Sequence, residues 1–307
     1  MDGLAYLQQR IQPLGEMTAF PSYFEIETVN ACNASCPMCT IDDWDRRDGL
    51  MSDDVFLKIA HEIGEHTDTV KRVQLFRDGE PLIDKKLALR TAIMKGVGVG
   101  KVGISTNAAL LTPAKSRDLL EAGMDEVILS IDSLVPSTYE RIRPPLKFDT
   151  VFANVLGFIH ERDRLGSTCQ AWVRMIRQEA NRAEWPMFEA YWRKILRPSD
   201  RVDYRNIHNW GVQLKDFRQI APADTVKPCV ALWSLMVIFA NGDVPRCNVD
   251  YNLKHPLGNV RDTSIAELWT RHEALRAQHM SGVRESICNG CTVWSQEANT
   301  EGERMAA

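Results

Sequence analysis

Apolar and polar positions follow two alternating rhythms between about residues 20 and 215. Short β-rich runs alternate with longer stretches in which apolar residues recur at helical spacing. We predict strands at Tyr23–Thr28, Arg72–Phe76, Val102–Ser105, Glu126–Ile131, Ala171–Arg177 and Val202–Asn206. We predict helices near Asp53–Glu65, Asp84–Lys95, Pro113–Ala122, Val151–Arg164 and Glu184–Leu196.

Six β/α units in succession predict a parallel sheet, because parallel strands need crossover helices. Six units are too few for a closed eight-stranded barrel. We therefore expect an α/β fold: an open, partial (β/α)6 barrel of the TIM-like type.

The pattern changes from Ala221 onward. The apolar run Trp233–Ala240, the turn signal Asn241-Gly242-Asp243 and the run Val244–Cys247 predict a β-hairpin. A helix is expected at Ser264–His279. We therefore divide the chain into an N-terminal segment (1–21), the partial barrel (22–220) and a small domain of a β-hairpin plus a helix (221–307).

Composition and charge exclude several classes of protein. Of the 307 residues, 44% are hydrophobic and 25% charged, as in globular chains, so disorder is excluded. The net charge of −4 gives no reason to expect nucleic acid or an anionic membrane as a partner. The longest apolar run, Val230–Ala240, is interrupted by Ser234 and is too short to span a bilayer. The first residues lack a basic leader, so we expect a cytoplasmic protein.

Eight cysteines carry most of the chemical information, and seven fall into two groups. Thiols stay reduced in the cytosol, so tight cysteine spacing favours metal binding or catalysis over disulfides. The remaining thiol, Cys169, stands at the start of the fifth predicted strand. We expect it to be a buried structural thiol, since free cysteine is among the most buried residue types.

The first group is Cys32, Cys36 and Cys39, just after the first predicted strand. Ligand sites of α/β sheets collect at this edge. Three thiols cannot complete a tetrahedral zinc site by themselves, although zinc with another ligand is the alternative. They can hold a 4Fe–4S cluster by three corners, which leaves one iron open.

The second group is Cys229, Cys247, Cys288 and Cys291. Four thiolates suffice for a structural zinc or for a fully ligated iron–sulfur cluster. A cluster without an open iron binds substrate poorly, so electron transfer is its expected role.

The Cys-x3-Cys-x2-Cys motif after the first strand resembles the signature of radical S-adenosylmethionine (SAM) enzymes. The resemblance implies that SAM chelates the open iron and is cleaved to a 5′-deoxyadenosyl radical, which takes a hydrogen atom from the substrate. Arg77–Pro81 is similar to the Gly-Gly-Glu-Pro segment of the family, with Asp78 in place of the first glycine. The SAM contacts that the resemblance implies are Met38, Asp78, Gly79, Glu80, Ser105, Asn107, Ser130 and Asp132.

The C-terminal region resembles the Twitch subset of the SPASM extensions of radical SAM enzymes. The resemblance rests on Cys-x12-Gly-x4-Cys, on Leu257–Val260, on Ser264–Trp269 and on the final Cys-x2-Cys. It implies one auxiliary cluster, and therefore two 4Fe–4S clusters in all.

Chains of this size with one auxiliary cluster resemble aminocyclitol dehydrogenases and aminoglycoside epimerases of antibiotic pathways. A dehydrogenase of this kind oxidises a secondary alcohol to a ketone and passes an electron to the auxiliary cluster. An epimerase instead quenches the carbon radical with a thiol. Cys169 lies roughly 26 Å from the ligand end of its strand, at about 3.3 Å per residue, which favours dehydrogenation.

Arg174, Arg177 and His208 are the candidate catalytic residues. A guanidinium suits a carboxylate of SAM or of the substrate, and strand alternation lets one of the two arginines point inward. Solvated arginines on the outer face are the alternative. His208 is a candidate proton acceptor, with a solvated or core histidine as the alternative.

The expected partners are an aminocyclitol or amino sugar and an electron donor of the flavodoxin or ferredoxin type. A maturase of ribosomal peptides is a second hypothesis. The short segment before the first strand counts against it. An iron–sulfur or zinc scaffold protein is a third, and Arg77–Pro81 argues against it.

Overall fold

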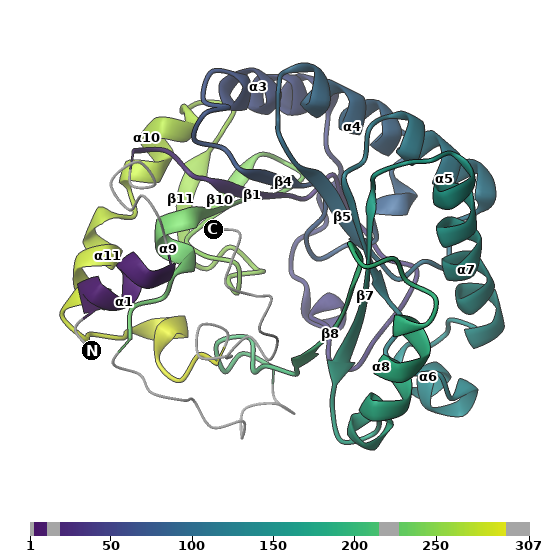
Figure 1. The fold of residues 1–307 in the computed structure, drawn as a ribbon. Helices are drawn as coiled ribbons and strands as arrows, with labels where there is room; N and C mark the ends of the chain where they lie inside the picture. Colours follow the sequence, from purple (N-terminus) through teal and green to yellow (C-terminus); the bar gives the residue numbers. More distant parts are fainter. Residues whose placement is uncertain (1–2, 11–18, 215–226, 293–307) are drawn as a thin grey trace.

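The computed structural model describes residues 3–10, 19–214 and 227–292, and these form a curved parallel sheet with helices on its convex side (Figure 1). All six predicted strands are present, and a seventh joins them. In their order across the sheet, the strands are β8 (Arg201–Asn206), β7 (Gln170–Arg177), β6 (Glu126–Ser130), β5 (Val102–Thr106), β4 (Arg72–Gln74), β1 (Tyr23–Ile26) and β9 (Leu235–Ile238). Every neighbouring pair is parallel, which confirms the α/β partial-barrel prediction.

Crossover helices cover the outside of the sheet. They are α3 (Asp53–Gly64), α4 (Leu87–Gly96), α5 (Pro113–Glu121), α6 (Pro136–Ile142), α7 (Phe148–Arg164) and α8 (Trp185–Arg193). The start of α5 shows how the sequence defines these elements. Thr112 Oγ1 accepts a hydrogen bond from Lys115 N, and Pro113 stands in the first turn, where a backbone N–H would have no partner within the helix. Helix α6 is the one of the six that the sequence patterns did not predict.

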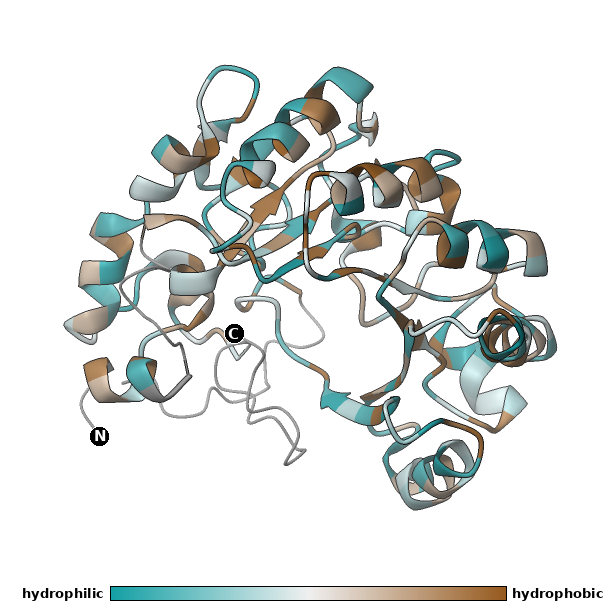
Figure 2. Ribbon diagram, turned by 45° about the horizontal axis from the view of Figure 1, so that its top comes forward, coloured by the Kyte–Doolittle hydropathy of each residue, from teal (hydrophilic) through white to brown (hydrophobic). Residues whose placement is uncertain are grey.

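Strand alternation divides the side chains between two environments. Outward side chains such as Val127, Leu129 and Val173 belong to the buried hydrophobic cluster that also contains the apolar residues of the helices. Figure 2 shows hydrophobic stretches, in brown, on both the strands and the helices. Burying one such side chain contributes roughly 1.5–3 kcal/mol. Inward side chains are largely polar or charged, so the chemistry of the protein lies on the concave side.

The C-terminal region differs from the predicted hairpin. The apolar run forms the short helix α9 (Ala231–Ser234) and strand β9, which pairs in parallel with β1. The reason is burial on both faces: all four residues of β9 are buried, as in parallel sheets, whereas a hairpin strand alternates. The hairpin that does form joins β10 (Asp243–Pro245) to β11 (Pro256–Asn259).

The predicted helix at Ser264–His279 is two helices, α10 (Ile265–Thr270) and α11 (Glu273–Met280). The remaining elements are α1 (Gly3–Arg10), the pair β2 (Val29–Asn30) and β3 (Gly49–Leu50), and the 3-10 turns η1 (Ile41–Asp43), η2 (Pro81–Ile83), η3 (Arg182–Glu184) and η5 (Ser286–Cys288). No helix in the described ranges combines the length and the apolar character that crossing a bilayer requires.

Candidate active site

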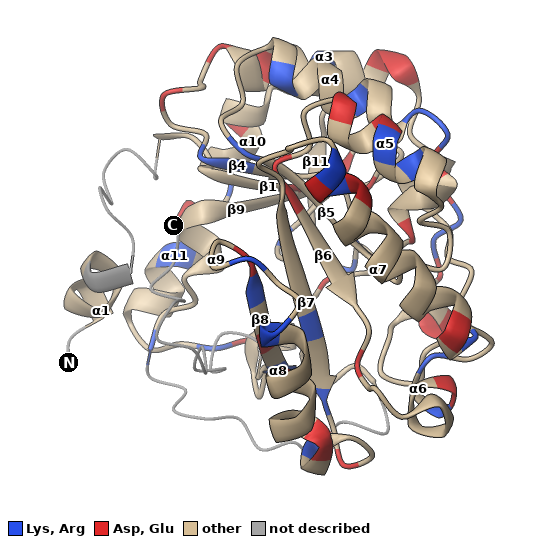
Figure 3. Cartoon of the chain, turned by 45° about the vertical axis from the view of Figure 1, so that its right-hand side comes forward, with Lys and Arg blue, Asp and Glu red and all other residues tan. Residues whose placement is uncertain are grey.

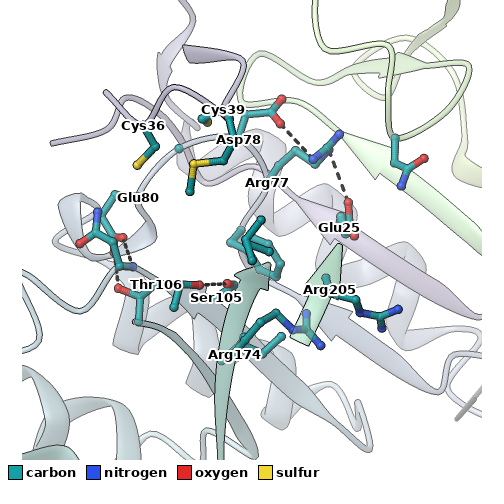
Figure 4. A pocket seen from close by; sticks show the side chains of 18 of the residues that line it. Glu25, Cys36, Cys39, Arg77, Asp78, Glu80, Ser105, Thr106, Arg174 and Arg205 are labelled. Carbon is teal, nitrogen blue, oxygen red and sulfur yellow. Dashed lines mark hydrogen bonds and ion pairs between the residues drawn. The ribbon is translucent and has the colours of Figure 1, made fainter. Parts of the chain in front are cut away.

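A cavity of about 520 Å³ opens on the concave side of the sheet. Cysteines and backbone loops form the side at the carboxyl ends of the strands, and arginines form much of the rest. Figure 4 shows Cys36 and Cys39 at one side of this cavity and Arg174 and Arg205 at the other.

All three cysteines of the first group line this cavity. Burial raises the pKa of the Cys32 thiol to about 11 and that of Cys39 to about 12. Two donors approach the sulfurs: Asn107 Nδ2 lies 3.9 Å from Cys32 Sγ, and Arg143 Nη1 lies 4.0 Å from Cys36 Sγ. Hydrogen bonds to cluster thiolates tune reduction potentials, so these donors suit an iron–sulfur site.

The segment after β4 lies directly against the cysteine loop. Glu80 N donates to Ala31 O at 2.8 Å. The Glu80 carboxylate is buried and accepts from Thr106 Oγ1 at 2.7 Å, from Asn107 N at 2.8 Å and from Leu82 N at 3.0 Å. Glu80 therefore ties the ends of β4 and β5 to the cysteine loop and presents a carboxylate to the cavity.

Gly79 is required by the closeness of this packing. A Cβ added there would lie 2.3 Å from Val29 O and 2.7 Å from Ala31 O, both backbone atoms that cannot turn away. We expect Gly79→Ala to displace the cysteine loop and to lower the iron bound after anaerobic reconstitution by about half, from about eight irons per chain to about four.

Gly157→Ala is the matched control, because nothing lies within 4 Å of a Cβ there. Its site is inside α7, where alanine stabilises a helix by about 0.5–1 kcal/mol relative to glycine, so iron content should not change. Equal iron in the Gly79→Ala variant and the native protein would show that the loop tolerates the displacement.

Asp78, which stands where the family motif has glycine, lines the cavity with a buried carboxyl group. It forms ion pairs with Arg77 Nη1 at 2.9 Å and with Arg46 Nη2 at 3.8 Å. Burial raises its pKa to about 6 despite these arginines. The substitution thus adds a charged group beside the cysteine loop.

Most of the other expected cofactor contacts line the same cavity: Met38, Ser105, Asn107 and Ser130. The hydroxyl oxygens of Ser105 and Ser130 lie 3.4 Å apart, at the ends of adjacent strands. The structure thus brings together three segments that are separated along the chain, as the resemblance implied.

Asp132 is an exception, because it is fully buried and is not among the residues that line the cavity. Its Oδ1 accepts from Ile176 N and its Oδ2 from Arg143 Nε, both at 2.6 Å. The expected contact with the SAM ribose is therefore corrected: Asp132 holds Arg143 in place.

The two candidate arginines of β7 separate as strand alternation requires. Arg174 lines the cavity, and its guanidinium binds both carboxylate oxygens of Asp203, at 3.0 and 2.9 Å. Arg177 does not line the cavity: it donates to Asn206 Oδ1 at 2.9 Å and lies over the Tyr204 ring. The proposed role of Arg177 at the cofactor or substrate is therefore wrong.

His208 lines the cavity, but its geometry counts against the expected role as a proton acceptor. Burial, with a smaller effect of nearby Arg77, lowers its pKa to about 4, so the ring is neutral near pH 7. Its Nδ1 accepts from Trp210 N at 3.3 Å. A neutral ring that accepts at Nδ1 carries its proton on Nε2 and can only donate there.

Arg143 and Asn248 are among the cavity residues that sequence reasoning missed. Arg143 is buried beside Cys36. Burial alone would lower the pKa of its guanidinium, but Asp132 and other nearby groups raise that pKa above its ordinary value. Trp210 Nε1 donates to Met38 O at 3.1 Å, across 172 positions of sequence. Arg143 follows α6 and Trp210 follows β8, and no regular sequence pattern indicates which way their side chains point.

The second group of cysteines, Cys229, Cys247, Cys288 and Cys291, surrounds a separate small cavity. Its other walls are largely apolar, from Leu232, Val249 and Ile287. Burial is the main cause that raises the pKa of Cys229, Cys247 and Cys288, and neighbouring cysteines add to it for Cys229 and Cys247. Asn248 lines both cavities, and Trp210 packs on the side of this cysteine group.

Cysteine spacing and burial fit iron–sulfur clusters better than single ions. Within residues 3–10, 19–214 and 227–292, no three His, Cys, Asp or Glu side chains are close enough together to hold one metal ion. Thiolates around a cluster stand farther apart than around one zinc ion. Bound at Cys32, Cys36 and Cys39, a cluster with one open iron would supply the electron that cleaves SAM.

Cys169 has the position that the sequence predicted. It is 2% exposed, precedes β7 and does not line the main cavity. The thiols that do line that cavity are those of the first group.

Two family models match the chain. Residues 26–158 match the Radical SAM superfamily, and residues 229–292 match SPASM, an iron–sulfur cluster-binding domain. Among curated relatives, a probable GTP 3′,8-cyclase of Methanothermobacter marburgensis is 32% identical over 44% of this chain and 43% of its own length. The first relatives found by sequence are matched over only 31% to 43% of their lengths.

Solved structures share the fold over most of the chain. BtrN in complex with AdoMet and 2-DOIA has a TM-score of 0.61 at 20% identity and covers 88% of this chain and 92% of its own. Streptococcus suis SuiB bound to precursor peptide SuiA has a TM-score of 0.62 at 13% identity and covers 96% and 75%. Residues 26–158 therefore form a domain of the Radical SAM superfamily, and residues 229–292 form an iron–sulfur cluster-binding domain of the SPASM type.

Proposed function

We propose that the enzyme oxidises a secondary alcohol of an aminocyclitol or amino sugar to a ketone. SAM held at a cluster on Cys32, Cys36 and Cys39 would supply the 5′-deoxyadenosyl radical that takes the hydrogen atom of this carbon and becomes 5′-deoxyadenosine. The hydroxyl gives its proton to a base, and a cluster held by the second cysteine group would accept the remaining electron. A reduced flavodoxin or ferredoxin supplies the electron for SAM cleavage.

The placement of thiols is the observation that carries this proposal over epimerisation. An epimerase needs a hydrogen donor next to the substrate carbon, and the cysteines that line the cavity are those of the cluster group. Cys169 is buried at the opposite end of β7. The proposed electron acceptor would adjoin the cavity instead, because Asn248 lines both the cavity and the second cysteine site.

Glu25 is the base that we propose. Its carboxylate lines the cavity on β1, 3.4 Å from Arg77 Nε and within reach of the Tyr23 hydroxyl at 3.3 Å. A carboxylate accepts at several lone pairs, so a substrate hydroxyl can share it with these two donors. Among the groups already considered, His208 lacks this capacity, since its free ring nitrogen is a donor.

The test is incubation of the reconstituted enzyme with SAM, a reductant and candidate aminocyclitols in deuterated water. We expect one ketone per 5′-deoxyadenosine and no deuterium on an intact carbinol carbon. An inverted carbon that carries solvent deuterium would establish epimerisation and reject the proposal. The same assay with GTP and with peptides tests the alternative substrates that the names of the sequence relative and of the SuiB complex suggest.

A further inference from the structure

Three arginines surround one tryptophan inside the barrel. The Cζ atoms of Arg174, Arg201 and Arg72 lie 4.2, 5.0 and 5.7 Å from the centroid of the Trp172 ring. These residues come from β7, β8 and β4 and all line the cavity. Figure 3 shows the basic segments on β7 and β8. We call Arg72, Arg174, Arg201 and Trp172 the arginine cluster.

The carboxylates that pair with this cluster lie behind it. Arg174 binds Asp203, and Arg72 forms an ion pair with Glu126; both acids are buried and neither lines the cavity. The side chain of Arg201 has no hydrogen-bond or ion-pair partner among the residues that the structure describes. The cluster therefore presents positive charge to the cavity while its negative charge faces the wall.

Unused donors point to the same conclusion. Trp172 is 5% exposed, and its Nε1 has no acceptor in the described part of the chain; the same holds for the buried Nε of Arg72. A buried donor without an acceptor destabilises the fold. Burial lowers the pKa of Arg72; the nearby charges of Arg174 and Arg201 lower it further, and Tyr23 and Glu25 act in the opposite direction. An anion bound by the guanidinium groups that line the cavity would relieve the repulsion among the three arginines.

We propose that the arginine cluster binds an anionic group of the substrate, a phosphate or a carboxylate. The inference rests on the proposed function and narrows its substrate to an aminocyclitol or amino sugar with such a group. Trp172 precedes Arg174 by two residues on β7, and Arg174 pairs in register with Ser130. The anion therefore lies roughly 7 Å deeper in the barrel than the level of Ser130.

Calorimetric titration of the reconstituted, SAM-bound enzyme without reductant tests this proposal. Two matched pairs of probes separate the sources of charge: glucosamine 6-phosphate with glucosamine, and glucuronate with glucose. We expect at least one anionic probe to bind about tenfold or more tightly than its uncharged counterpart, because hydrogen bonds to charged groups contribute roughly 1.5–3 kcal/mol. A preference for glucosamine 6-phosphate identifies a phosphate site, and a preference for glucuronate identifies a carboxylate site.

Arg201→Gln should abolish most of this preference, and Arg201→Lys should restore part of it through its charge. Among the described residues, the Arg201 side chain has no hydrogen-bond or ion-pair partner that its loss would leave unpaired, so folding and iron content should be retained. Arg164→Gln is the control, since Arg164 pairs with Glu161 on the outer surface of α7. Equal binding within both probe pairs, or a full preference in Arg201→Gln, would overturn the inference. Binding without ketone formation would reject the proposed reaction but leave the anion site standing.

Discussion

Replacing Cys288 and Cys291 together by alanine should leave SAM cleavage intact and abolish the ketone. The reason is the separation of the two cysteine groups, since neither residue lines the main cavity. Iron should fall from about eight to about four per chain, because one 4Fe–4S cluster loses two of its four ligands. 5′-Deoxyadenosine should still form, with ketone at least a hundredfold lower for each cofactor cleaved.

Cys169→Ala is the matched control for this variant. It removes a buried thiol that belongs to neither group, so iron content and ketone yield should stay at the native level. The measurements are iron and sulfide analysis with chromatography of both products. A variant that still forms the ketone at the native ratio would show that the electron leaves by another route.

The path that we propose for this electron runs between the two adjoining cysteine sites. Asn248, next to Cys247 in the chain, lines both cavities. Trp210 lines the main cavity, donates to Met38 O beside Cys39, and packs on the residues around Cys247 and Cys291. In the proposed reaction, an electron that leaves the substrate would cross this packed protein to reach the second site.

How far the sequence predicts this fold depends on whether a feature is local. The six barrel strands and the two cysteine groups follow from periodicity and spacing within short segments. Strand β9 was misassigned because its partner, β1, lies more than 200 residues away. The apolar run Trp233–Ala240 indicates that the strand is buried, but the turn signal Asn241-Gly242-Asp243 predicts a hairpin and outweighed it.

The site residues divide in the same way. Alternation along β7 correctly limited the inward arginines to one, and only the register with β6 and β8 identifies it as Arg174. Asp132 was assigned to the cofactor from its place after β6, whereas a partner 11 residues later, Arg143, turns it into a positioning residue. Arg143 itself follows α6, where no regular pattern indicates which way a side chain points.

Loss of the first cysteine group should have the largest effect of all. In the variant with Cys32, Cys36 and Cys39 replaced by alanine, we expect 5′-deoxyadenosine to fall to the level found without protein. SAM then has no open iron to bind, and the buried network of Glu80, Thr106 and Asn107 cannot reduce it. Iron should again fall by about half, since the second group retains all four thiols.

The pattern of signals distinguishes this variant from simple misfolding. Cys32, Cys36 and Cys39 lie in a loop outside the sheet, so the barrel and the second site should keep their structure. The remaining iron should give the spectrum of one cluster, and circular dichroism should match the native protein. Substantial 5′-deoxyadenosine from this variant would mean that SAM is cleaved without a cluster at Cys32, Cys36 and Cys39. The assignment of SAM cleavage to the first cysteine group would then be wrong.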